Sequence, residues 1–191
     1  MVDPRSNYPL NEYIKRTNLL LHSIFSYYLP TELIINILDL AERWLLGYST
    51  PHHKNCRFKI IEPGEEVILA TPPLSRQVIA NLRIITFDFR SKVQGWCSDW
   101  SGGSWTWFEA VLCGDVNSND RAGKYLLQRN EQAGKEMKGY HIELRKTEQH
   151  ELFRNLRVGD RIGLVECAAF PGWVNYVESA RLQLWMVDNL S

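Results

Sequence analysis

QGWCSDWSGGSWTWFE, residues 94–109, gathers four of the seven tryptophans of the chain around a Gly102-Gly103 turn. Each aromatic side chain removes a large apolar area from water and dominates the packing around it. Tryptophans this dense therefore predict either a core or the floor of a binding surface. We take this stretch as the centre of the fold.

The second half of the stretch continues into residues 104–113, which are apolar at both alternating sets of positions. Side chains alternate between the two faces of a strand, so a strand of this kind is central or has its second face covered. We expect Phe108, Ala110 and Leu112 to face the interior of the domain. Trp105 and Trp107 then face outward, and the N-terminal helices are the expected cover for Trp107.

Other segments downstream of Cys56 also show the two-residue period of strands, separated by Gly and Pro turns. The strands are expected at residues 57–61, 66–70, 83–90, 104–113, 124–128, 139–145, 161–169 and 178–187. No helical segments lie between them to make parallel crossovers, so the chain should be mainly β, with an antiparallel sandwich. We expect a helical segment at residues 1–48, a linker with the first strand at 49–65, and the sandwich at 66–191.

Two helices are expected before the sandwich. Apolar residues recur at three- and four-residue steps over residues 11–28, with Asn11 as the expected cap. A second helix is expected to begin at Pro30 and to run to Trp44 or Leu45. Its apolar set is wider than one stripe, which indicates two contact surfaces. One can face the first helix, and the other must meet the sandwich or another protein.

Residues 29–40, LPTELIINILDL, resemble the opening of an F-box, which has the form Leu-Pro-x-Glu followed by aliphatic residues. The resemblance implies docking on the Skp-type adaptor of a cullin-RING ubiquitin ligase by helix-in-groove packing. The implied adaptor-binding residues are Leu29, Pro30, Leu33, Ile34, Ile37 and Leu38. The alternative is that the two helices only seal one end of the domain.

A broader resemblance covers most of the chain. TPPL at 71–74, QGW at 94–96, GSWTWFEA at 103–110, GDRI at 159–162 and FPGWVNYVESARLQLW at 170–185 resemble a group of fungal F-box-like proteins. Those proteins join the same kind of helix to a tryptophan-rich β domain. The order of segments is also loosely similar to F-box-associated domains, which implies a jelly-roll-like, galactose-binding-like sandwich with an N-terminal helical pair.

Loop tryptophans supply candidates for a ligand site, because side chains in loops are freer to contact a ligand. Aromatic rings beside Asp and Asn suit sugar or peptide recognition, since a ring can stack on C–H groups while the polar groups bind hydroxyls or amides. The ligand-binding candidates are Trp96, Asp99, Trp100, Trp173, Asn175 and Tyr176. The alternative is that these side chains only anchor the loops.

No catalytic constellation or metal-ligand pattern stands out in the sequence. Glu109 is the carboxylate of greatest interest, since it shares a strand face with Trp105 and Trp107, and pairing with Arg181 or a loop N–H is its expected structural role. The cysteines Cys56, Cys97, Cys113 and Cys167 are widely spaced and form no CxxC pair, so buried thiols are expected rather than zinc ligands. We expect no enzyme activity, no cofactor and no bound metal.

The charge balance argues against nucleic-acid and membrane partners. Lys plus Arg and Asp plus Glu each number 22, so no basic surface is indicated. The first residues lack the apolar run of a signal peptide, which predicts a cytoplasmic or nuclear protein. The F-box resemblance implies a non-catalytic substrate receptor of a ubiquitin ligase. The alternative is a stand-alone carbohydrate- or peptide-binding sandwich in which the helices only complete the fold.

Overall fold

The computed structural model describes residues 7–50, 53–60, 63–94, 103–114 and 121–187. Its helical elements are α1 (Asn7–Phe25), α2 (Thr31–Leu40), α3 (Arg76–Asn81), η2 (Lys146–Glu148) and α4 (Glu151–Asn155). Its strands are β1 (Trp44–Ser49), β2 (His53–Ile60), β3 (Gly64–Ala70), β4 (Leu82–Val93), β5 (Thr106–Cys113), β6 (Arg121–Arg129), β7 (Lys138–Arg145), β8 (Arg161–Ala168) and β9 (Asn175–Val187). Each of the eight predicted strands overlaps one of these.

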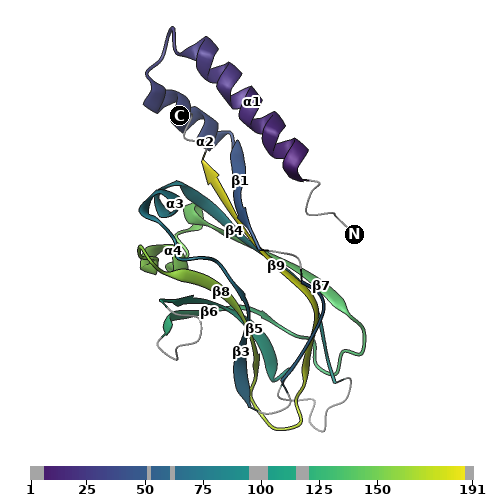
Figure 1. Ribbon diagram of the computed structural model, residues 1–191. Helices are drawn as coiled ribbons and strands as arrows, with labels where there is room; N and C mark the ends of the chain where they lie inside the picture. The colour runs from purple at the N-terminus through teal and green to yellow at the C-terminus, as the bar shows by residue number, and fades with distance from the viewer. Residues whose placement is uncertain (1–6, 51–52, 61–62, 95–102, 115–120, 188–191) are drawn as a thin grey trace.

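The strands form two antiparallel sheets that pack face to face (Figure 1). The first sheet has the order β1-β9-β4-β7, with β2 also paired to β9, and the second has the order β3-β8-β5-β6. A jelly roll has the same arrangement, with β2, β9, β4 and β7 in one sheet facing β3, β8, β5 and β6 in the other. The predicted class, a mainly β jelly-roll-like sandwich with an N-terminal helix pair, is confirmed.

The core lies between the two sheets and is built from alternate residues of both. Phe108, Ala110 and Leu112 on β5 are fully buried in it, as predicted. The rings of Phe89 on β4 and Phe108 lie 4.2 Å apart between centroids, so they join the two sheets directly. Aromatic burial of this kind supplies a large share of the stability of a domain.

The helix pair lies at one end of the sandwich, beside β1 and β9 of the first sheet (Figure 1). The first helix begins at Asn7, so Asn11 is an internal residue and its predicted role as a cap is wrong. Its side chain instead bonds the backbone of Leu46 twice, accepting from the N–H at 2.8 Å and donating to the carbonyl at 2.8 Å. Seven residues further on, Asn18 is fully buried and accepts a hydrogen bond from Arg43. These two asparagines tie α1 to the chain at β1.

Replacing Asn11 with alanine is expected to lower the free energy of unfolding by about 1–2 kcal/mol, because both hydrogen bonds to Leu46 are lost. The amide of Leu46 should then exchange faster with solvent, which hydrogen-exchange mass spectrometry or NMR can measure. Asn36→Ala, at an exposed position of α2, is the matched control and should leave this amide unchanged. Equal exchange at Leu46 in the wild type and Asn11→Ala would contradict the assigned contact.

The second helix is shorter than predicted, since it ends at Leu40 rather than at Trp44 or Leu45. Glu42 has a φ of 53°, a left-handed conformation that ends the helix and turns the chain. Trp44 and Leu45 therefore lie on β1, where they pair with Val187 and Met186 of β9. The periodic apolar pattern of the sequence continues through this turn. The pairing of β1 with β9, far along the chain, nevertheless makes residues 44 and 45 part of a strand.

The N-terminal helices do not cover Trp107, and that prediction is wrong. They contact β1 and β9 of the first sheet, whereas Trp107 lies on the outer face of β5 in the second sheet. There its indole N–H donates to Glu109 Oε1 at 2.7 Å, and the guanidinium of Arg129 lies 5.5 Å from its ring. Val111, Cys113, Val165 and Cys167 form a small buried cluster on the same face.

In the described part of the chain, no helix combines the length and the apolar character needed to span a bilayer.

Candidate functional site

The second helix presents two different faces, as its broad apolar set indicated. Ile34 and Leu38, four residues apart, are 1% and 4% exposed and pack inward. Leu33 and Ile37, also four residues apart, lie on the other face and are 48% and 45% exposed. The inward pair therefore holds α2 against the rest of the molecule, while the outward pair is left in solvent.

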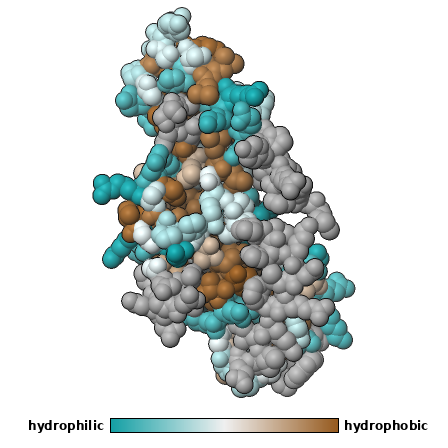
Figure 2. Space-filling model, in the orientation of Figure 1, coloured by the Kyte–Doolittle hydropathy of each residue, from teal (hydrophilic) through white to brown (hydrophobic). Residues whose placement is uncertain are grey.

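The apolar surface extends from α2 onto its surroundings. Figure 2 shows hydrophobic surface over the helical end of the molecule. The exposed large apolar side chains of this end, in α1, α2 and the turn between them, are Tyr13, Leu19, Leu20, Ile24, Tyr27, Tyr28, Leu33, Ile37 and Leu40. Single exposed apolar residues are ordinary, but a concentration of them in one segment is typical of an interaction site. We call the outward residues of α2, Leu33, Ile37 and Leu40, the α2 outer face.

The six predicted adaptor-binding residues separate into three groups. Leu33 and Ile37 are on the α2 outer face, where a partner can reach them. Ile34 and Leu38 are buried within this chain, so they support the helix rather than meet a partner. Leu29 is half-buried and Pro30 is exposed at the N-cap of α2.

The predicted loop site is only partly described. Trp96, Asp99 and Trp100 lie outside the described residues. Trp173 and Tyr176 are half-buried, and the Lys92 ammonium lies 5.7 Å from the ring of Tyr176. Asn175 is fully buried, so it faces the interior and not a ligand.

Asn175 belongs to a buried polar network at one end of the sandwich. The Nδ2 of Asn130 donates to Asn175 Oδ1 and to Thr106 Oγ1, each at 3.0 Å. Ser91 donates from its hydroxyl to Asn130 Oδ1 at 2.8 Å. Buried polar groups need partners inside the protein. Here the partners lie on β4 and β9 of the first sheet and on β5 of the second, so the network joins the two sheets. Its role is therefore to hold the sheets together at this end.

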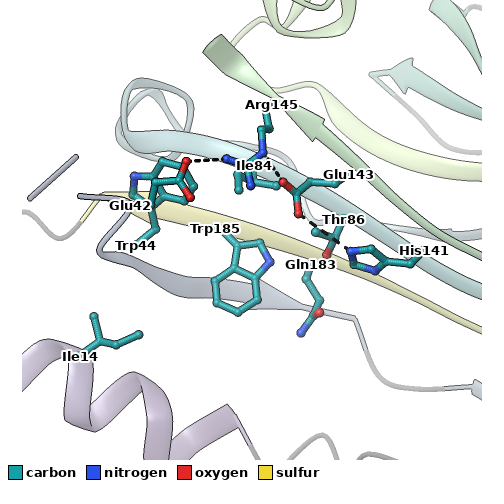
Figure 3. Close-up of a pocket in the computed structure, with 10 residues that line it drawn as sticks. All are labelled: Ile14, Glu42, Trp44, Ile84, Thr86, His141, Glu143, Arg145, Gln183 and Trp185. Atoms are coloured by element: carbon teal, nitrogen blue, oxygen red, sulfur yellow. Dashed lines mark hydrogen bonds and ion pairs between the residues drawn. The ribbon is translucent and has the colours of Figure 1, made fainter. Parts of the chain in front are cut away.

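A groove that the sequence did not predict lies on the outer face of the first sheet, on the side that faces α1 (Figure 3). It has a volume of about 290 Å³. We call it the sheet groove. Three rows of outward side chains cross β9, β4 and β7. The first row is Trp185, Ile84 and Arg145, and the second is Gln183, Thr86 and Glu143. The third row is Arg181, Asp88 and His141. The first two rows line the groove together with Ile14, Glu42, Trp44 and His141.

One rim of the sheet groove is a chain of charged side chains that runs from Glu42 through Arg145 and Glu143 to His141 (Figure 3). Arg145 pairs with Glu42 at 2.7 Å and with Glu143, and its guanidinium lies 5.7 Å from the ring of Trp44. His141 lies 2.6 Å from Asp88, between Nδ1 and Oδ1. Each side chain of the rim thus has a charged partner within this chain.

The middle of the sheet groove contains polar side chains that have no hydrogen-bond partner among the described residues. Thr86 is 4% exposed, and its Oγ1 has no hydrogen-bond partner within the described chain. The side-chain amide of Gln183, in the same row, makes no hydrogen bond to another described residue. A buried hydroxyl without a partner is costly in a folded protein. A ligand that supplies donors and acceptors can satisfy both groups, and it reaches Thr86 Oγ1 after a small shift of the side chains that enclose that oxygen.

Glu109 has a partner other than the predicted one. Its Oε1 accepts from Trp107, and Arg181 instead binds Asp88 at 3.2 Å. One ligand atom of Glu109 lies within 4.8 Å of those of Glu65 and Cys167. Lys124 binds Glu65 at 2.6 Å, however, and already neutralises the exposed acid of that group. We assign no metal to these residues.

Glu166 is the one other buried carboxylate with an unusual environment among the described residues. It is 0% exposed, and neither of its oxygens has a hydrogen-bond partner there. Burial raises the pKa of its carboxyl group from 4.5 to about 8, with a further contribution from the nearby charge of Glu66. Glu166 therefore stays protonated at neutral pH, and we find no nucleophile or metal site around it among the described side chains.

The signal for the sheet groove was partly present in the sequence. Gln183 and Trp185 alternate with Leu182 and Leu184 in the last strand, which identifies them as one face. The pattern of a single strand cannot show which strands lie beside it. The residues that complete the groove come from α1, the turn at Glu42, β1, β4 and β7, and only the tertiary fold brings them together.

No protein-family model and no curated protein sequence matches the chain. Among solved structures, the chain is similar to the structure of infectious bursal disease virus Gx strain, with 8% identity, a TM-score of 0.44, and coverage of 74% of this chain and 32% of that chain. It is also similar to the VP2 subviral particle of infectious bursal disease virus, with 6% identity, a TM-score of 0.38, and coverage of 76% and 35%. The chain thus spans about a third of those chains, and the likeness concerns the fold alone.

Proposed function

We propose that this protein is a non-catalytic interaction module in which the helix pair docks on a Skp-type adaptor of a cullin-RING ubiquitin ligase. The sandwich then carries the surface that recognises a target. The observation that carries this proposal is the α2 outer face, where Leu33, Ile37 and Leu40 are exposed on a helix whose other face is buried.

The apolar side chains of the α2 outer face are more stable in an apolar groove of another protein than in contact with water. An amphipathic helix that inserts into an apolar groove does so through residues at three- and four-residue spacing. Leu33, Ile37 and Leu40 have this spacing, and the first of them lies three residues after the exposed Pro30. The F-box-like order of residues 29–40 supports a Skp-type adaptor as the partner, acting in the cytoplasm or nucleus.

Exchanging two residues of the α2 outer face tests the proposal. The double variant Leu33→Asp, Ile37→Asp is expected to weaken binding of purified Skp-type adaptor by at least about 100-fold, because two apolar anchors become charged. Co-purification of the adaptor with the full chain measures the effect. The melting temperature should stay within a few degrees of the wild type, since both side chains are already about half exposed.

Leu126→Asp is the matched control, because Leu126 is 54% exposed on β6, away from the helix pair. It should bind the adaptor as the wild type does. Adaptor binding that survives the double variant would contradict the proposal. Unfolding of the double variant would also contradict it, because these side chains would then belong to the core of this chain.

A further inference from the structure

We propose that the sheet groove is a binding site for a neutral saccharide, which stacks on Trp185 and forms hydrogen bonds with the row of Gln183, Thr86 and Glu143. This inference rests on the sandwich and the wall that α1 contributes. It does not depend on the partner of the α2 outer face, so either proposal can fail without the other.

The shape of the sheet groove suits a sugar ring. In Figure 3 the Trp185 ring lies in the middle of the groove, with Gln183 beside it and Ile14 of α1 on the opposite side from the charged rim. A volume of about 290 Å³ is near the lower limit of typical small-molecule sites and leaves room for about one or two sugar rings. An indole face offers an apolar platform for the C–H groups of such a ring.

The polar groups of the sheet groove also match a polyhydroxylated ligand. The Thr86 hydroxyl is buried and unpartnered in the described chain, and the Gln183 amide next to it makes no hydrogen bond to another described residue. Together they can donate and accept, as a sugar hydroxyl does. The apolar platform and this polar row lie in adjacent rows of the same sheet face, two residues apart along each strand. A flat ring with polar edges can contact both at once.

The charges of the sheet groove argue against an ionic ligand. Glu42 and Glu143 are both paired with Arg145, so the lining offers an anion no unpaired cation. A cationic ligand would have to displace the Arg145 guanidinium from two carboxylates, which are its charge-assisted partners. The rim can still accept hydrogen bonds from hydroxyl groups through the carboxylate oxygens. A neutral ligand rich in hydroxyl groups therefore fits the charge distribution better than an ion.

Titration of the full chain with simple sugars tests the inference. The probes are the methyl β-glycosides of glucose, galactose and N-acetylglucosamine, together with cellobiose and lactose, followed by saturation-transfer NMR and tryptophan fluorescence. At least one probe is expected to bind with a Kd of about 1–10 mM, as is usual for a small ligand with few contacts. Trp185→Ala should weaken that binding by at least about tenfold, since the stacking platform is lost.

Thr86→Val keeps the shape of the side chain and removes only the hydroxyl, so the protein should fold normally. It is expected to weaken sugar binding by about fivefold or more while leaving the melting temperature equal or higher, because an unpartnered buried hydroxyl is removed. Trp173→Ala, in the loop before β9, is the control and should bind as the wild type does. The inference is overturned if no probe binds at about 50 mM, if Thr86→Val binds unchanged, or if the groove takes only peptides.

Discussion

Replacing Glu166 with glutamine is expected to remove a loss of stability that the wild type shows between about pH 4 and pH 8. Glu166 is fully buried, and its pKa is raised from 4.5 to about 8 by burial first and by Glu66 second. Across that interval the unfolded chain releases the proton and the folded chain retains it. The free energy of unfolding of the wild type therefore falls as pH rises, since the folded state binds more protons.

The size of the effect follows from the width of the interval. Each pH unit between 4.5 and about 8 removes about 1.4 kcal/mol, so the full loss is about 5 kcal/mol. The loss is absent below the unfolded pKa and complete above the folded one. Denaturant unfolding of the wild type and Glu166→Gln at several pH values should give curves that diverge by this amount.

The matched control for this series is Glu148→Gln, because Glu148 is an exposed glutamate in η2. Its unfolding free energy should follow that of the wild type at every pH. If the wild type and Glu166→Gln show parallel pH dependence, the carboxyl group of Glu166 is not held protonated by burial. That result would mean that water or another part of the chain stabilises its charge.

Phe108→Ala is expected to lower the free energy of unfolding by about 3–5 kcal/mol, the range found for removing a buried phenylalanine ring. Phe108 is 0% exposed, and its ring stands 4.2 Å from that of Phe89 between centroids. The substitution leaves a cavity between the two sheets, which a packed sandwich fills only partly. Chemical denaturation monitored by circular dichroism measures the loss.

Leu126→Ala serves as the comparison for Phe108→Ala, since it removes an apolar side chain that is half exposed on the neighbouring strand β6. We expect it to change stability by less than about 1 kcal/mol. A similar small effect from Phe108→Ala would show that the centre of β5 is not the core. The stretch at residues 94–109 would then lose its place at the centre of the fold.

The sandwich could be predicted because local patterns and long-range packing agree in most strands. Alternation in the strand at residues 83–90 and in the last strand identified the inner faces correctly, as the burial of Ile85, Phe87, Leu182 and Leu184 shows. Both faces of β5 are apolar, and β5 is indeed a central strand of its sheet. In these segments the two-residue period reflects burial directly.

Other features depended on contacts that a local pattern does not contain. Trp44 and Leu45 continue a helical period but lie on β1, because the left-handed turn at Glu42 directs the chain to β9. Trp107 and Glu109 share a strand face, as expected, but their cover could not be assigned without knowing which sheet receives the helices. The sheet groove also needed the topology, since β9, β4 and β7 are far apart along the chain.

The burial of the predicted site residues also depends on long-range packing. Helical spacing identified the apolar residues of α2 but not their division between Leu33 with Ile37 and Ile34 with Leu38, which depends on where the helix packs. Asn175 follows a loop tryptophan closely, yet it is turned into the polar network with Asn130. Loop position alone therefore does not establish that a polar side chain is accessible to a ligand.

Calorimetric titration of the full chain with a purified Skp-type adaptor tests the central proposal most directly. We predict one-to-one binding with a Kd of about 10 μM or lower, driven by burial of the α2 outer face. The heat should disappear in the double variant Leu33→Asp, Ile37→Asp and remain in Leu126→Asp. Absence of binding to the folded wild-type chain at about 100 μM adaptor would contradict the proposed docking.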